Sequence, residues 1–152
     1  MDILSPNAVS VHLKAKTKEE SLKEMVDLLI ESGQLPVSQR EVSIKALMER
    51  EALGSTGVGQ GVAIPHAKVD GLKKIVAALG ISPKGILFDS IDQMPARVFF
   101  LLLAPKNSAE AHLKALARIS RLVKENDHFR TQLEKSESSA DVVRLIRQED
   151  TF

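Results

Sequence analysis

The chain of 152 residues has 43% apolar and 27% charged residues, which is the composition of a globular protein. It contains no cysteine, which excludes disulfides, thiolate metal sites and cysteine nucleophiles within this chain. A net charge of +1 and the absence of Trp and Tyr argue against nucleic-acid binding, because that function depends on cationic surfaces and stacking aromatic side chains.

Five helices are predicted where a capping residue precedes apolar residues at helical spacing. The first two end at Gly33 and Gly54. The fourth helix, which carries Phe129 and Leu133, is short. The expected N-caps in chain order are Thr17, Ser38, Asn107, Asp127 and Ser138.

The predicted strands lie between these helices. They cover residues 9–15, 62–64, 75–81, 86–88 and 98–103. Residues 9–15 alternate between apolar and polar, whereas 98–103 are apolar throughout, which is typical of a central strand covered on both faces. Residues 92–95 are expected to form the turn of a hairpin that leads into this central strand. The order of elements predicts an α/β fold, in which a mixed sheet is flanked by helices on both faces.

We expect residues 1–152 to form a single domain, because no repeat, low-complexity segment or linker divides them. The longest apolar run, residues 98–104, is too short to cross a bilayer. The N-terminus also lacks the basic and then apolar pattern of a secretory signal. The expected location is therefore the cytoplasm.

The segment from Gly54 to Lys68 is the most unusual part of the sequence. Four glycines within the eight positions 54–61 exclude a helix and disfavour a strand. A short apolar strand follows, and Pro65 is expected to end it, so that His66 projects from a stiffened turn at a strand end. The glycines are not followed by Gly-Lys-Ser/Thr or by a helix, so nucleotide binding is not expected.

His112 is a second candidate, because it lies in the first turns of the helix after the predicted central strand. Helix N-termini favour anions. If the two strand ends are neighbours, His66 and His112 face one cleft. In the alternative interpretation His112 is an ordinary exposed residue on a basic helix face. We expect His12 and His128 to be exposed and to have no function.

The residues Arg50-Glu51-Ala52-Leu53-Gly54-Ser55-Thr56-Gly57, followed by Val62-Ala63-Ile64-Pro65-His66-Ala67, resemble the signature of a known family. It is the enzyme IIA family of the bacterial phosphotransferase system, in its fructose/mannitol/nitrogen-regulatory branch. Further matches are Phe88-Asp89, Phe99 to Pro105, His112-Leu113 and Leu116-Ala117. Gln93 departs from the pattern, since the family often has glycine there.

The resemblance implies a histidine phosphocarrier, a component of a phosphotransferase. His66 would accept a phosphoryl group from the phosphohistidine of a histidine-containing phosphocarrier protein, either HPr or its nitrogen-branch homologue. Enzyme I charges that donor from phosphoenolpyruvate. His112 and Arg50 would support the phosphoryl group, and we expect the hydroxyls of Ser55 and Thr56 and glycine N–H groups to add donors.

A backbone carbonyl or another acceptor is expected to hold the proton on one ring nitrogen of His66, leaving a lone pair on the other. No cofactor is expected. No metal is expected either, because only Asp70 among the carboxylates flanks His66 and two histidines are too few for a zinc centre. Because two different proteins must reach His66, a shallow apolar surface is expected around it. The candidates for its rim are Leu53, Val58 and Val62.

The resemblance leaves the role of the carrier open between two types. A free-standing domain favours the nitrogen-regulatory type, which signals by binding target proteins according to its phosphorylation state. The alternative is a sugar-specific component that passes the group to a cysteine on a separate IIB protein. A further alternative is a regulatory binding module that is never phosphorylated. A hydrolase using His66 as a general base is disfavoured, since no serine nucleophile motif or metal site is evident.

Overall fold

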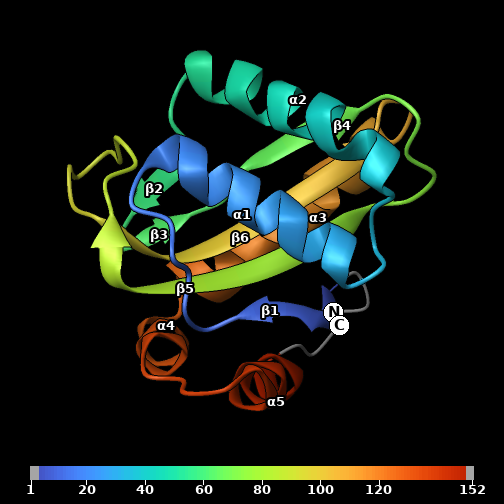
Figure 1. The fold of residues 1–152 in the computed structure, drawn as a ribbon. Helices are drawn as coiled ribbons and strands as arrows, with labels where there is room; N and C mark the ends of the chain where they lie inside the picture. The colour runs from blue at the N-terminus through green and yellow to red at the C-terminus, as the bar shows by residue number, and fades with distance from the viewer. Residues whose placement is uncertain (1–3, 150–152) are drawn as a thin grey trace.

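A six-stranded mixed sheet lies between two layers of helices in the computed structural model, which describes residues 4–149 (Figure 1). The strands are β1 (Leu4–Ser10), β2 (Gly57–Gly59), β3 (Val62–Ala63), β4 (His66–Val69), β5 (Val76–Ile86) and β6 (Ala96–Pro105). The helices are α1 (Lys18–Glu31), α2 (Arg40–Ala52), α3 (Ala109–Lys124), α4 (Asp127–Glu134) and α5 (Ser139–Glu149), with a 3₁₀ turn η1 (Val37–Gln39) before α2. The three residues at each end of the predicted 1–152 domain lie outside the described residues.

The centre of the sheet is the antiparallel pair β5 and β6. Strand β1 adds to β5 in parallel, and β3 and β4 both pair in parallel with the other side of β6. Ala63 lies opposite Phe99, and His66 lies opposite Leu102, so β3 and β4 share one register along β6. They are therefore two parts of one strand that is interrupted at residues 64–65 without a change of register.

This register corrects the predicted environment of His66. The expectation that Pro65 ends the strand and leaves His66 on a turn is wrong, because His66 is the first residue of β4. Proline lacks an N–H group, but the carbonyl of Pro65 still accepts a hydrogen bond from the N–H of Leu102 at 2.9 Å. The ladder therefore continues past the proline.

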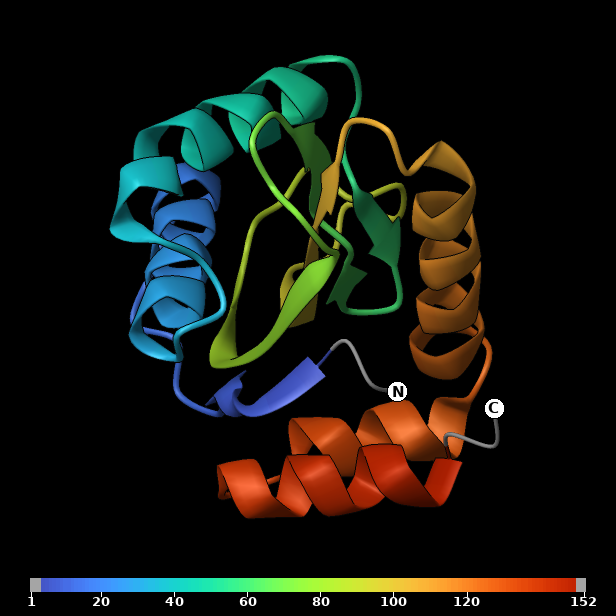
Figure 2. The ribbon, with the colours of Figure 1, turned by 90° about the vertical axis from the view of Figure 1, so that its right-hand side faces the viewer.

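The side chains of β6 alternate between two cores, as the pleat of a strand requires. Phe99, Leu101 and Leu103 pack with the apolar faces of α1 and α2. Val98, Phe100 and Leu102 pack with those of α3, α4 and α5 on the opposite face. Figure 2 shows the strands enclosed between these two groups of helices. The predicted fold class and the predicted central strand covered on both faces are confirmed.

Two of the five predicted helix caps are confirmed. Thr17 Oγ1 accepts from the N–H of Glu20 at 3.2 Å, and Ser138 Oγ accepts from the N–H of Asp141 at 3.1 Å. The other three are wrong by one residue, since the helices begin after Gln39, Ser108 and Asn126. Before α2 the chain forms the turn η1 instead of a side-chain cap.

Strand boundaries differ more from the predictions. Strand β1 begins at Leu4 and ends at Ser10, whereas the predicted strand covered residues 9–15. The predicted alternation of burial nevertheless continues to Leu13, and the N–H of Leu13 donates to the carbonyl of Ile81. The two strands predicted at 75–81 and 86–88 are one long strand, β5, with an irregularity between Ile81 and Ile86. The glycine-rich segment forms a short strand, β2, that pairs with β3. None of the helices among residues 4–149 combines the length and the apolar character needed to cross a membrane.

Candidate functional site

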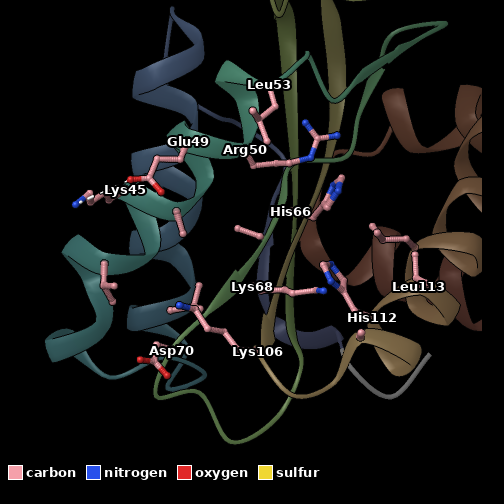
Figure 3. A pocket seen from close by; sticks show the side chains of 16 residues that line it. Lys45, Glu49, Arg50, Leu53, His66, Lys68, Asp70, Lys106, His112 and Leu113 are labelled. Carbon is pink, nitrogen blue, oxygen red and sulfur yellow. Dashed lines mark ion pairs between the residues drawn. The ribbon is translucent and has the colours of Figure 1, made fainter.

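A cleft of about 820 Å³ lies between α2 and α3, with β4 along its floor. Helix α2 contributes Arg50 and Leu53 from its C-terminal end, and α3 contributes His112 and Leu113 from its first turns. His66 lies on the floor between them (Figure 3). Arg50, His66 and His112 are far apart in sequence, and the structure brings all three into this cleft.

The ring of His66 is oriented by its own backbone. Its Nδ1 lies 2.8 Å from the carbonyl oxygen of Ile64, two residues earlier, so Nδ1 donates its proton to that oxygen. A neutral ring held in this way carries its lone pair on Nε2. The predicted backbone acceptor is therefore present, and it is made possible by the interruption of the strand at residues 64–65.

The electrostatic surroundings keep the ring of His66 neutral. Burial of this half-buried side chain lowers its pKa, and the positive charge of Arg50 lowers it further. The bond to Ile64 and the carboxylate of Glu51 act in the opposite direction, but the net pKa lies below the ordinary value of 6.5. At neutral pH the lone pair on Nε2 is consequently available.

His112 lies against His66, and its side chain is only 5% exposed. The two ring centroids are 5.5 Å apart, and the ring planes are inclined by 70°. Burial, the proximity of His66 and that of Lys68 lower the pKa of His112. Its Nε2 atom is buried and has no hydrogen-bond partner among the described residues. Buried polar atoms in proteins are as a rule hydrogen-bonded, so this atom is an exception that marks the cleft for attention.

Arg50 is fixed beside the histidines by the turn that follows its helix. Its Nη1 donates to the carbonyl oxygen of Gly54 at 2.8 Å. Figure 3 shows its guanidinium on the side of His66 opposite to His112. A guanidinium has several N–H donors in one plane, and this geometry suits the oxygens of a phosphoryl group.

Three further cations line the cleft, and they were not predicted from the sequence. They are Lys45, Lys68 and Lys106. Lys68 lies two residues after His66 in β4, and side chains two apart in a strand share a face. This periodicity was a signal for Lys68, but it depends on recognising β4 as a strand. Two acidic residues, Glu49 and Asp70, also line the cleft, so its charge is positive but not uniform.

The hydroxyls and apolar side chains that were expected around His66 do not all lie at the cleft. The hydroxyl of Ser55 donates to the carbonyl of Phe88 and that of Thr56 to the carboxylate of Glu51, so neither is directed to the cleft. Leu53 is 85% exposed at the rim, as expected, whereas Val62 is fully buried in the core and Val58 packs against the α3–α5 side of it. The histidines at positions 12 and 128 are exposed and do not line the cleft.

The sequence matches a family described as "Phosphoenolpyruvate-dependent sugar phosphotransferase system, EIIA 2" over residues 2–149. It is 40% identical over 126 residues to a "Nitrogen regulatory protein" of Bradyrhizobium diazoefficiens, covering 83% of this chain and 80% of the relative. It is 37% identical over 134 residues to a "PTS system fructose-specific EIIA component" of Haloferax volcanii, covering 88% and 85%.

A third relative is much longer. The "PTS system fructose-specific EIIABC component" of Bacillus subtilis is 34% identical over 149 residues, which are 98% of this chain and only 23% of that protein. The chain therefore spans about a quarter of that relative's length. Relatives of this domain thus occur both as free-standing proteins and within larger ones.

Solved structures with the same fold agree with the sequence comparison. The structure of the nitrogen regulatory protein IIA-Ntr from Neisseria meningitidis is similar with a TM-score of 0.85 and 29% identity, covering 95% of this chain and 97% of that one. Enzyme IIA mannitol from Escherichia coli, solved in complex with phosphorylated enzyme IIB mannitol, has a TM-score of 0.76 at 20% identity and shares the fold, covering 95% and 97%. The chain belongs to the EIIA 2 family of the phosphoenolpyruvate-dependent sugar phosphotransferase system.

Proposed function

We propose that this protein is a phosphoryl carrier that accepts its phosphoryl group on Nε2 of His66. The single observation that carries the proposal is the bond between His66 Nδ1 and the carbonyl of Ile64, which leaves Nε2 as the nucleophilic atom within an open cleft. The donor is the phosphohistidine of a histidine-containing phosphocarrier protein, HPr or its nitrogen-branch homologue.

In the transfer step, the N–P bond of the donor breaks as a bond forms between phosphorus and Nε2 of His66. The donor ring regains its lone pair, and the proton on Nδ1 of His66 stays in place. Phosphoryl transfer has a loose transition state, so the protein contributes mainly by positioning the groups and stabilising charge. Arg50 supplies N–H donors to the phosphoryl oxygens, and the unpartnered Nε2 of His112 gains a hydrogen-bond partner when the phosphoryl group is present.

Relatives named nitrogen regulatory protein support the regulatory type of carrier. In this role the phosphorylation state of His66 decides which regulatory target proteins bind. The length of the chain does not separate the two types, because it covers 85% of a fructose-specific relative as well. The alternative therefore remains a sugar-specific component that passes the group to a cysteine of a separate IIB protein.

The proposal is tested by mixing the protein with phosphoenolpyruvate, enzyme I and HPr and recording its intact mass. We expect an acid-labile gain of one phosphoryl group that His66→Ala abolishes. His12→Ala and His128→Ala are matched controls, since both residues are exposed histidines outside the cleft, and both variants should be modified like the wild type. An unmodified wild type in the presence of active donor, tested with HPr and with its nitrogen-branch homologue, supports instead a binding module that is never phosphorylated.

The two types of carrier are then distinguished with the phosphorylated protein. It is incubated with a purified fructose-type IIB protein, and the phosphoryl content of both proteins is followed with time. A regulatory carrier retains its group under these conditions. Rapid appearance of the group on the IIB cysteine identifies the sugar-specific alternative.

A further inference from the structure

Glu51 is a buried carboxylate beside the cleft that the proposed transfer step does not use. It follows Arg50 in the last turn of α2, and its side chain is 3% exposed. Lys18, the first residue of α1, forms an ion pair with its Oε1 at 3.1 Å. A buried carboxylate requires such a partner and further hydrogen bonds, because its desolvation is unfavourable.

Those further hydrogen bonds come from the glycine-rich segment. The backbone N–H of Thr56 lies 3.2 Å from both carboxylate oxygens of Glu51, and the hydroxyl of Thr56 donates to Oε2. The chain therefore folds back after α2 so that Thr56 is tied to the end of the same helix.

The same turn contains the contact that orients Arg50. Gly54, whose φ of +153° favours glycine, lies between the helix and Thr56, and its carbonyl oxygen accepts from Nη1 of Arg50. Two neighbouring side chains of α2 thus hold one turn from two sides. Arg50 binds it at Gly54 from the cleft, and Glu51 binds it at Thr56 from the interior.

We propose that Glu51 is a positioning residue: its carboxylate, anchored by Lys18, fixes Thr56 and hence the Gly54 carbonyl that holds the Arg50 guanidinium beside His66. Glu51 does not line the cleft, so it acts through Arg50 and not by contact with the phosphoryl group. The significance of this arrangement for transfer rests on the proposed function. The arrangement itself can be tested without phosphorylation.

The test exploits two opposite electrostatic effects on His66. The negative charge of Glu51 raises the pKa of His66, while the positive charge of Arg50 lowers it and has the larger effect of the two. If Glu51 acts only through its own charge, Glu51→Gln lowers the pKa of His66. If Glu51 positions Arg50, the same variant releases the guanidinium and the pKa of His66 rises.

We would measure the pKa of His66 by NMR titration of the unphosphorylated protein. The expected result is a rise in Glu51→Gln, and a fall when the same substitution is made in an Arg50→Ala background. Such a reversal of sign shows that the effect of Glu51 passes through Arg50, since effects of coupled residues are not additive. Glu49→Gln is a matched control, because it removes an exposed carboxylate of the same helix whose ion pair is with Lys45 at 4.0 Å.

Thr56→Val is the second variant, and it decides the question if Glu51→Gln does not fold. It removes the hydroxyl that donates to Glu51 and leaves the backbone N–H of Thr56 in place, so it loosens the tie without abolishing it. Every charge is kept, so a direct electrostatic effect is absent. Positioning predicts a rise in the pKa of His66 here also, together with a transfer rate at saturating donor that falls on the order of tenfold. A fall in Glu51→Gln, or an unchanged pKa in both variants, overturns the proposal; where Glu51→Gln does not fold, an unchanged pKa in Thr56→Val overturns it.

Failure of this proposal and failure of the proposed function are distinguishable. A wild type that accepts no phosphoryl group, combined with the expected changes in pKa, removes the carrier function and leaves the positioning role intact. Normal phosphorylation of His66 in Glu51→Gln and Thr56→Val, with no rise in pKa in either, leaves the carrier and removes the positioning role.

Discussion

Two regions that interrupt or connect the strands, residues 64–65 and residues 87–95, are held in different ways. At residues 64–65 backbone groups still find partners: the N–H of Ile64 donates to the carbonyl of Thr56 at 3.0 Å, and the carbonyl of Pro65 accepts from the N–H of Leu102. The carbonyl of Ile64 accepts from the side chain of His66. The connection between β5 and β6, residues 87–95, instead contains two non-glycine residues with positive φ, Asp89 and Gln93.

The two regions also differ in exposure. Ile64 is buried, whereas three apolar side chains of the β5–β6 connection, Leu87, Ile91 and Met94, are exposed. Within the connection Asp92, an exposed carboxylate, accepts from the N–H groups of Gln60 at 2.8 Å and Met94 at 3.1 Å. Backbone without positive φ thus presents the proposed acceptor histidine, while two of the three non-glycine residues with positive φ among residues 4–149 lie in the β5–β6 connection. Substitutions around residues 64–65 should therefore change the rate of phosphoryl transfer, and those in residues 87–95 should change the unfolding free energy.

Arg50→Ala should produce the largest effect, and this effect should be on the rate of phosphoryl transfer. Loss of the guanidinium removes donors that stabilise the transferring phosphoryl group, so transfer to His66 should slow on the order of 100-fold. The lost bond to Gly54 should lower the unfolding free energy by only about 1 kcal/mol. Rapid-quench kinetics and urea denaturation measure the two quantities.

The control for this prediction is Lys45→Ala, which removes an exposed cation from the same helix and the same cleft. It should slow transfer far less than Arg50→Ala. Equal losses in the two variants would mean that the total positive charge of the cleft matters and that the placement of Arg50 does not.

The pH dependence of transfer is the next largest effect. Because burial and the charge of Arg50 lower the pKa of His66, the rate of phosphoryl acceptance should stay constant from pH 8 to about 6.5. Below the lowered pKa it should fall tenfold for each pH unit, as the proton occupies the lone pair of Nε2. A rate that already declines above pH 7 contradicts the neutral ring inferred from the site.

The same histidines make folding stability depend on pH. His66 and His112 both have a pKa below the ordinary value in the folded state, so the unfolded chain binds protons more readily. The unfolding free energy should therefore decrease as the pH falls from about 6.5, and this decrease should level off below both folded pKa values. Denaturation of His66→Ala over the same range should show a smaller decrease.

The fold could be predicted from the sequence, and His66 could be proposed as a functional residue, because local patterns indicate both. The continuous apolar run at residues 98–103 is sufficient to indicate a doubly covered central strand. The resemblance to the family also pointed to Arg50 and His112. The proximity of these two residues to His66 depends on the pairing of β4 with β6, and local sequence does not show which strands pair.

The incorrect expectations share a physical cause. Pro65 was expected to end a strand because it lacks an N–H group, yet the ladder uses only its carbonyl. The hydroxyls of Ser55 and Thr56 were expected to face a phosphoryl group, but Phe88 and Glu51 engage them. In each case the hydrogen-bond partner of a polar group in the folded chain differs from the one expected. That partner is brought into place by the fold, and the local sequence does not show it.

Gly57→Ala should have a moderate effect, and it probes the contact between β2 and the β5–β6 connection. A Cβ atom at residue 57 would lie 3.0 Å from the Cα of Ser90 in the β5–β6 connection and closer still to its hydroxyl oxygen. Because one of these atoms is backbone, the connection must shift, and the unfolding free energy should fall by about 1–3 kcal/mol. Adding Ser90→Gly removes the hydroxyl and Cβ and should restore part of this loss, which urea denaturation can measure.

Gln93→Gly should have the smallest effect, and it should raise the unfolding free energy, whereas Gly57→Ala should lower it. Gln93 has a φ of +60°, and its N–H donates to the carbonyl of Ser90 at 2.9 Å. Glycine keeps this bond and removes the left-handed strain, but it also gives the unfolded chain more freedom. The net result should be a gain in unfolding free energy of roughly 0.5 kcal/mol, with phosphoryl transfer unchanged.

Gln93→Ala separates the backbone from the side chain at this position. It retains the strain and removes the amide, so its stability should equal that of the wild type if the side chain contributes nothing. A loss of stability in both variants would show that the Gln93 side chain stabilises the loop more than its backbone strains it. The β5–β6 connection would then resemble residues 64–65, in that its own contacts hold it in place.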